Sequence, residues 1–104
     1  MPYLSAFKVV YAEAAKQHLR GLTARQRSIA VHGIEASLTY EPNVQARNRK
    51  PMREDDLGAE WELRIGALRV YYEVQDQPER RVSVLAVGLK MGSTVRIGGE
   101  KVAL

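Results

Sequence analysis

Apolar and polar side chains alternate most clearly between residues 61 and 74. Apolar side chains occupy every second position from Trp61 to Ile65 and again from Leu68 to Val74, with mainly charged side chains between them. A period of two is typical of half-buried β-strands. Gly66-Ala67 separates the two stretches, and glycine at the first of two central positions favours a type II′ turn. The pattern therefore predicts a β-hairpin with one apolar and one charged face.

A two-residue turn also determines which residues of this hairpin face one another. The expected cross-strand pairs on the apolar face are Ile65 with Leu68, Leu63 with Val70, and Trp61 with Tyr72. The same register sets Arg64 directly opposite Arg69 on the charged face. Directly opposed like charges destabilise a sheet. The arginine pair therefore suggests an anion between the two side chains.

The first part of the chain predicts one strand and two helices. The strand covers Ala6 to Tyr11, with apolar side chains at alternate positions. Apolar residues at helical spacing predict a helix from about Ala12 to Leu22, and Gly21 loosens its end. A second helix, capped by Thr23, runs to about Tyr40.

The second part of the chain predicts a sheet. Residues 43–58 have no apolar period and form a long connection to the hairpin. Residues 81–89 are nearly continuous in apolar side chains, which indicates an inner strand covered on both faces. Residues 75–80 then form the loop before it, and Pro78 fits a loop better than a strand. Residues 94–97 predict a short edge strand, which Gly98-Gly99 ends before a tail.

These elements together predict an α+β fold. It has an N-terminal strand, a two-helix hairpin and then a three- to four-stranded, mostly antiparallel sheet. The chain has 104 residues, which suits one domain over residues 1–104 with a single core. Residues 92–104 are either an edge strand or a tail in this interpretation.

The composition excludes several classes of protein. The chain has no cysteine, so disulfides, thiolate zinc sites and cysteine nucleophiles are excluded. No apolar run approaches the roughly 20 residues of a membrane span. The N-terminal residues lack the charged start and long apolar stretch of a signal peptide. We therefore expect a soluble, cytoplasmic protein with no membrane partner.

Positive charge is concentrated in the first half of the chain. Residues 1–53 hold nine basic and three acidic side chains, and residues 54–104 hold seven basic and nine acidic ones. A basic surface attracts nucleic acid or an acidic protein. The densest basic cluster comprises Arg47, Arg49, Lys50 and Arg53 in the long connection. Such a cluster either binds RNA phosphates without reading sequence or is a solvated charged loop.

Other polar residues give weaker indications of a site. Glu54, Asp55 and Asp56 form a carboxylate cluster with no histidine nearby, which favours a solvated turn over a metal site. His18 and His32 have no partners at ligand spacing and are interpreted as surface or boundary residues. No glycine-rich turn has the context of a phosphate-binding loop. No metal or other cofactor is therefore expected.

Three sequence stretches resemble one protein family. They are Leu-Arg-Ile-Gly at the hairpin turn, Arg-Val-Tyr-Tyr-Glu-Val after it, and Val-Leu-Ala-Val-Gly-Leu-Lys in the inner strand. With the predicted order of elements, residues 5 to 91 resemble the RelE/ParE toxin superfamily of bacterial toxin–antitoxin systems, and the RelE branch in particular. The resemblance implies a cognate antitoxin as partner. It also implies action on the ribosome and mRNA for the RelE branch, or on DNA gyrase for the ParE branch.

The resemblance implies catalytic roles for two basic residues. Arg69 matches the arginine that contacts the scissile phosphate in RelE-like toxins, and Lys90 falls where the family usually places a basic residue. A guanidinium held by a rigid strand can stabilise the charge that develops when RNA is cleaved by its own 2′-hydroxyl. Lys90 would hold phosphate or protonate the leaving oxygen. Arg64 would assist from the opposite strand.

The chain also departs from the RelE pattern. RelE-like nucleases commonly carry a tyrosine or histidine near the C-terminal end, and here none follows Tyr72. Glu60 and Glu62 stand where several family members have lysines. Glu62 is either a general base or an ion-pair partner of an arginine. Tyr71, on the charged face, either supports substrate or covers the sheet.

Three functions therefore remain open at this point. The first is a ribosome-dependent mRNA endonuclease that needs no metal and inhibits translation. The second is a gyrase-inhibiting toxin of ParE type. The third is a toxin-fold protein that binds an antitoxin but has lost catalysis. An apolar or acidic antitoxin segment would add to the sheet or lie across the basic face.

Overall fold

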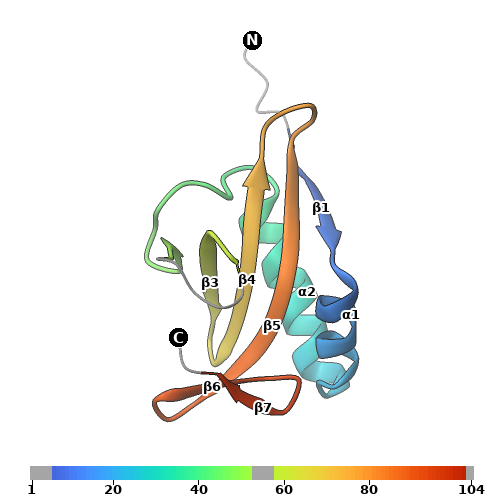
Figure 1. Ribbon diagram of the computed structural model, residues 1–104, viewed down its shortest axis with the longest axis vertical. Coiled ribbons are helices and arrows are strands. Elements are labelled where there is room, and N and C mark those ends of the chain that lie inside the picture. The colour runs from blue at the N-terminus through green and yellow to red at the C-terminus, as the bar shows by residue number, and fades with distance from the viewer. Residues whose placement is uncertain (1–5, 53–57, 103–104) are drawn as a thin grey trace.

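The chain folds into one mixed β-sheet with two helices on one of its faces (Figure 1). The computed structural model describes residues 6–52 and 58–102. The helices are α1 (Glu13–Arg20) and α2 (Ala24–Leu38). The strands are β1 (Lys8–Tyr11), β2 (Arg49–Pro51), β3 (Trp61–Ile65), β4 (Leu68–Gln75), β5 (Arg81–Met91), β6 (Thr94–Ile97) and β7 (Glu100–Val102). The α+β fold class predicted from the sequence is confirmed.

The strand order of the sheet is β2-β3-β4-β5-β6-β7, and β1 pairs with β5 in parallel. All other neighbours are antiparallel. The long strand β5 pairs with β1 along residues 81–84 and with β6 along residues 88–91, as Figure 1 shows. The sequence did not predict β2 and β7. Each has only three residues, which is too short for an apolar period to be visible.

The hairpin of β3 and β4 has the predicted register. Its three apolar cross-strand pairs form as expected, and Arg64 lies opposite Arg69. Gly66 has φ 57°, and no described residue other than glycine has a positive φ. A positive φ at the first central position alone is what a type II′ turn requires.

The main core lies between the helices and the sheet. It contains Ala15 and Leu19 from α1, Ile34 and Leu38 from α2, and Val70, Val82 and Val84 from the sheet, all buried. Thr23 caps α2 as predicted, because its hydroxyl accepts from the backbone of Gln26 while the Gln26 side chain accepts from the backbone of Thr23. Arg27 then ties the two helices together, since its guanidinium donates to the carbonyls of Leu19 (2.9 Å) and Leu22 (3.1 Å).

A second, smaller core lies on the face of the sheet turned away from the helices. It consists of Ala59, Tyr71, Ala86, Val95 and Ile97. Residues 94–97 form β6 as predicted, and Gly98-Gly99 ends that strand. The tail expected after it is wrong in part, because these two glycines, with φ 61° and 84°, form the turn from β6 to β7. The hairpin of β6 and β7 contributes Val95 and Ile97, which cover part of the face that the sequence pattern presents as open and charged.

The long connection after α2 is anchored from both sides. The buried hydroxyl of Tyr72 donates to the carbonyl of Pro42 at 2.6 Å. Ala46 and Arg49 exchange two backbone hydrogen bonds, with N–O distances of 2.8 and 3.3 Å. Arg49 is the first residue of β2, which pairs with β3. The connection therefore begins to contribute to the sheet before the predicted hairpin.

Candidate functional site

The predicted catalytic residues gather on one face of the sheet. Glu62 lies opposite Tyr71, and Arg64 lies opposite Arg69. Arg69 in turn lies opposite Gly88 of β5, two positions before Lys90 on the same face. We call this the hairpin face and define it by Glu62, Arg64, Arg69, Tyr71 and Lys90. It is turned away from the helices, because Leu63 and Val70, which alternate with these residues, belong to the main core.

The Arg69 guanidinium is held by the turn of its own hairpin. Its Nη1 donates to the carbonyl of Gly66 at 2.6 Å and to that of Leu68 at 2.9 Å, and the residue is only 8% exposed. Nε and Nη2 make no hydrogen bond to the described residues. The side chain is thus fixed in orientation while two donors stay available, which is the arrangement that recognition of a phosphate requires.

Glu62 and Arg64 form an ion pair along β3. Arg64 Nε lies 2.8 Å from Glu62 Oε1, and the Glu62 side chain is 11% exposed against 41% for Arg64. Between the two roles that the sequence left open for Glu62, this geometry favours the ion-pair partner. It also relieves the opposition of Arg64 and Arg69, because the carboxylate draws the Arg64 guanidinium toward its own strand.

Lys90 lies next to the hairpin turn that holds Arg69. Its backbone N–H donates to the carbonyl of Ala67 at 2.8 Å, which joins the end of β5 to the turn. Its side chain is exposed. An exposed lysine side chain therefore leaves the same face of the sheet as Arg69, close to the same turn.

Tyr71 does not have the accessibility that contact with RNA requires. The side chain is fully buried in the second core, against Ala86, Val95 and Ile97. Between the two roles that the sequence allowed, the structure favours covering the sheet. The physical reason is the hairpin of β6 and β7, whose coverage of this face the sequence pattern did not reveal.

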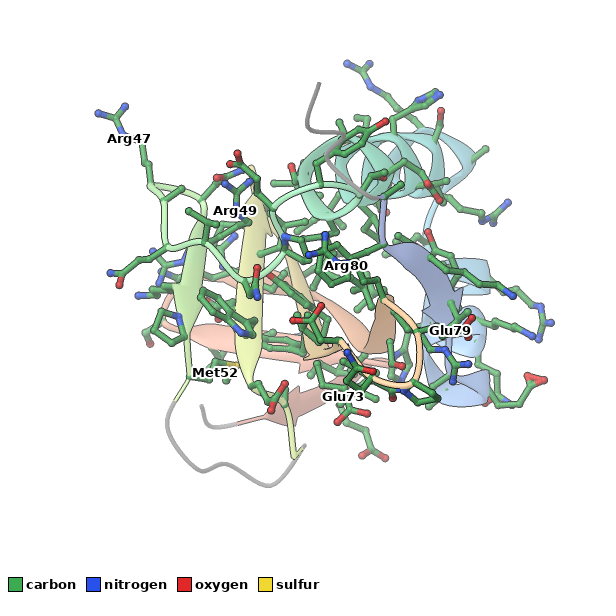
Figure 2. All side chains as sticks on the ribbon, turned by 90° about the horizontal axis from the view of Figure 1, so that it is seen from above. Arg47, Arg49, Met52, Glu73, Glu79 and Arg80 are labelled. Atoms are coloured by element: carbon green, nitrogen blue, oxygen red, sulfur yellow. The ribbon has the colours of Figure 1, made fainter. Side chains whose placement is uncertain are left out.

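The basic cluster of the long connection separates into residues with different roles (Figure 2). Arg47 points away from the protein and is exposed. Lys50 is also exposed and lies opposite Glu62, which places it at the border of the hairpin face. Arg53, like Glu54, Asp55 and Asp56, lies outside the described residues.

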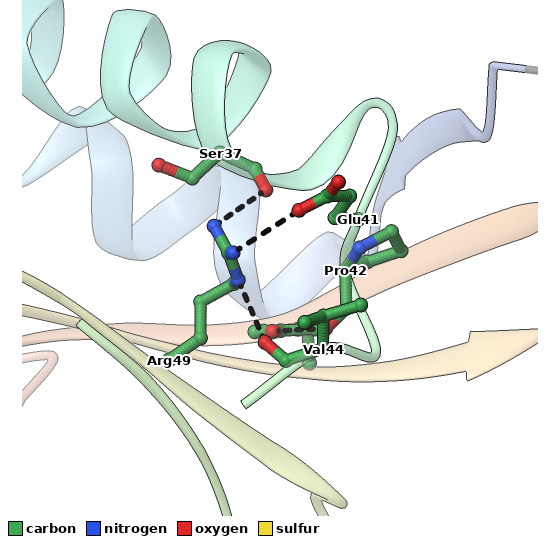
Figure 3. A network of polar contacts seen from close by, with 6 residues as sticks. Ser37, Glu41, Pro42, Val44 and Arg49 are labelled. Atoms are coloured by element: carbon green, nitrogen blue, oxygen red, sulfur yellow. Dashed lines mark hydrogen bonds and ion pairs between the residues drawn. The ribbon is translucent and has the colours of Figure 1, made fainter. Parts of the chain in front are cut away.

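Arg49 is engaged within the protein (Figure 3). Its Nε donates to the carbonyl of Val44 at 3.0 Å, its Nη1 donates to that of Ser37 at 3.3 Å, and its Nη2 lies 3.8 Å from a carboxylate oxygen of Glu41. The side chain is 13% exposed. All three guanidinium nitrogens are therefore used to fasten the long connection to the end of α2. The predicted RNA contact of Arg49 is not compatible with this arrangement.

The histidines differ from one another in the structure. His32 is exposed on α2. His18 of α1 is half-buried, and its Nδ1 accepts a hydrogen bond from the backbone N–H of Val87 at 3.2 Å. Burial lowers the pKa of His18 below its ordinary value. No sequence pattern could reveal this contact, because the two residues are 69 positions apart.

Comparison with solved structures finds a chain of similar fold and sequence. A chain in the crystal structure of the toxin–antitoxin complex RelBE2 from Mycobacterium tuberculosis matches with a TM-score of 0.66 and 27% sequence identity. The match covers 82% of the present chain and 99% of that chain. Fold and sequence similarity together support the RelE/ParE toxin superfamily for this chain. No family model and no curated protein sequence matches it.

Among the described residues, no group of histidine, aspartate and glutamate side chains is arranged to hold a metal ion. Within the same residues, no helix has the length and apolar character needed to cross a membrane. The carry-over of Arg69 and Lys90 from the RelE pattern is spatially consistent, because both lie beside the Gly66-Ala67 turn.

Proposed function

We propose that the chain is the toxin of a toxin–antitoxin pair and that it cleaves mRNA on the ribosome through its hairpin face. The similarity to a chain of a toxin–antitoxin complex, in fold and in sequence, supports the toxin role and a cognate antitoxin partner. The single observation that carries the nuclease proposal is Arg69, fixed by the hairpin turn with two donors still available.

The proposed reaction is attack of an RNA 2′-hydroxyl on the adjacent phosphate. The phosphorane transition state places additional negative charge on the non-bridging oxygens. Nε and Nη2 of Arg69 can donate to two of these oxygens without first reorienting. Lys90 is close enough to the same turn to neutralise the phosphate or to donate a proton to the leaving 5′-oxygen.

Glu62 and Arg64 act as a supporting pair in this proposal. Their ion pair at 2.8 Å keeps the Arg64 charge at the border of the site. When RNA enters, Arg64 can exchange part of its contact with Glu62 for a phosphate, and Glu62 then becomes available to accept the 2′-hydroxyl proton. Arg47 and Lys50 extend the basic surface toward rRNA or mRNA phosphates, a contact that carries no sequence preference.

The test is primer extension on mRNA from a bacterial cell-free translation reaction. The wild-type chain should produce discrete, ribosome-dependent cuts. Substitution Arg69→Ala should reduce cleavage about 100-fold or more, because it removes donors that act on the transition state. Lys90→Ala should also reduce cleavage, and its side chain is exposed, so that loss of activity would not reflect misfolding.

The matched control is Arg25→Ala, which removes an exposed arginine from the start of α2, on the helix-bearing side. It should cleave like the wild type. Circular dichroism would confirm that each variant is folded. Intact mRNA with folded wild-type protein would overturn the nuclease proposal, and a DNA-damage response in intact cells would then direct the search to gyrase.

A second candidate is an antitoxin-binding module without catalysis. The observation that favours it is the low accessibility of Glu62, the candidate general base, which is 8% exposed and is paired with Arg64. Stable complex formation with the partner encoded beside the gene, together with intact mRNA and normal growth on overexpression, would establish this candidate.

A further inference from the structure

A cleft of about 680 Å³ lies between α1 and the hairpin of β6 and β7. Leu22, Val87 and Leu89 provide apolar lining, and His18 and Arg96 are among its polar residues. Leu89 of β5 and Arg96 of β6 are cross-strand partners. Along β5, Leu89 alternates with Gly88 and Lys90, whose side of the strand is the hairpin face. The cleft is therefore on the helix-bearing side of β5, opposite to the hairpin face.

The cleft exists because one edge of β5, the edge opposite to β4, has no strand neighbour for a short stretch. The parallel partner β1 ends opposite Val84, and the antiparallel partner β6 ends opposite Gly88. Between these points the backbone N–H of Val87 donates to a side chain, Nδ1 of His18. His18 of α1 thus supplies the hydrogen-bond acceptor that a neighbouring strand would otherwise provide. The cleft remains beside this contact.

The contact with Val87 determines which nitrogen of His18 is a donor. Nδ1 accepts a hydrogen bond, so in the neutral ring the proton is on Nε2. Nε2 makes no hydrogen bond to the described residues. The ring edge lies against Gly98, where an added Cβ would be 3.3 Å from Cδ2 and 3.5 Å from Nε2. Glycine at this position therefore leaves room for the ring.

Arg96 supplies a positive charge to the same cleft. The residue is exposed and forms no ion pair with the described residues. Glu100 is the single acidic residue of the lining. A guanidinium and a neutral N–H donor beside an apolar floor are complementary to a carboxylate that is attached next to an aliphatic side chain.

We propose that this cleft is a docking site for a segment of a partner protein that presents an acidic side chain beside an aliphatic one. The carboxylate would bind Arg96 and Nε2 of His18, and the aliphatic side chain would cover Leu22 and Leu89. This proposal rests on the proposed toxin role, because that role implies a protein partner. Because the cleft and the hairpin face are on opposite sides of the sheet, a segment bound here leaves Arg69 and Lys90 uncovered.

The test is a titration of the full-length, isotopically labelled chain with the blocked dipeptide N-acetyl-leucyl-glutamyl amide, followed by amide chemical shifts. We expect saturable shifts at Leu22, Val87, Leu89 and Gly98 with a dissociation constant in the millimolar range. The glutamine analogue of the dipeptide should bind about tenfold more weakly, because it lacks the charge that Arg96 recognises.

Two variants and one control test the residues of the cleft. Arg96→Gln and His18→Phe should each weaken dipeptide binding, and the same spectra show whether each variant is folded. Arg20→Gln, at an exposed position at the end of α1 outside the cleft lining, should bind like the wild type. Shifts centred on the hairpin face, equal binding of both dipeptides, or no shift up to about 10 mM would overturn the proposal.

This outcome is independent of the nuclease test. The titration needs neither ribosomes nor mRNA, so absence of cleavage leaves its result unchanged. Conversely, failure of the dipeptide to bind removes the docking site and does not affect the expected loss of cleavage in Arg69→Ala.

Discussion

At the scale of single residues, the arginines of this chain divide into those that hold the fold and those that face solvent. Arg69 and Arg49 are both largely buried and both donate to backbone carbonyls. They differ in the number of guanidinium donors that remain available. Two nitrogens of Arg69 have no hydrogen bond to the described residues, whereas all three nitrogens of Arg49 are engaged. Sequence spacing could not distinguish these two cases, since Arg49 reaches Ser37, 12 positions earlier in the chain, only through the fold of the long connection.

Arg49→Ala should therefore lower the free energy of unfolding by about 2 kcal/mol, because carbonyl groups of Val44 and Ser37 lose their donors. Urea unfolding followed by circular dichroism measures the change. Arg47→Ala is the matched control and should change the free energy by less than about 0.5 kcal/mol, since the side chain points into solvent. Equal effects of the two substitutions would contradict the structural role of Arg49.

At the scale of secondary-structure elements, local patterns predicted most of the fold correctly. The register of the β3–β4 hairpin follows from the two-residue turn, and the capping of α2 follows from Thr23 and Gln26. The helices begin and end within two residues of their expected bounds. Strands β2 and β7 were not predictable, because three residues are too few to show an apolar period. The contact between α1 and Val87 was not predictable either, because it joins residues 69 positions apart.

The contact between α1 and β5 makes stability depend on pH. Burial lowers the pKa of folded His18 below the unfolded value of 6.5. The unfolded chain then binds more protons near this pH, so the His18 contribution is fully present above about pH 6.5 and is lost as the pH falls through the folded pKa. Protonation also removes the lone pair with which Nδ1 accepts from Val87.

The expected result is a free energy of unfolding that decreases as the pH falls below about 6.5. Urea titrations at several pH values measure it. In His18→Gln this part of the pH dependence should disappear, whereas His32→Gln, which changes the exposed histidine of α2, should retain it. A decrease that persists unchanged in His18→Gln would show that another group is responsible.

At the scale of the whole molecule, the sheet carries a core on each face. The larger one lies under the helices, and the smaller one surrounds Tyr71 beneath the hairpin of β6 and β7. The sequence pattern of β4 predicted only the first, because Tyr71 alternates with charged residues and reads as part of a solvated face. The sequence could therefore predict which residues share the hairpin face. It could not predict that Tyr71 on this face is buried.

Deletion of residues 92–104 should expose Tyr71 and Ala86 to solvent and lower the free energy of unfolding by about 2 kcal/mol or more. Urea unfolding of the shortened chain measures the loss. Binding of a dye that reports exposed apolar surface should increase in parallel. A shortened chain with unchanged stability and no dye binding would show that the second core contributes little.

The backbone of β2 has a consequence for how these molecules behave at high concentration. An outermost strand normally offers a row of amides and carbonyls to which another chain can add. In β2, the amide and the carbonyl of Arg49 are already exchanged with Ala46, and Pro51 has no amide hydrogen. This side of the sheet therefore offers no free amide along β2, and strand addition by a second copy of the protein is disfavoured there.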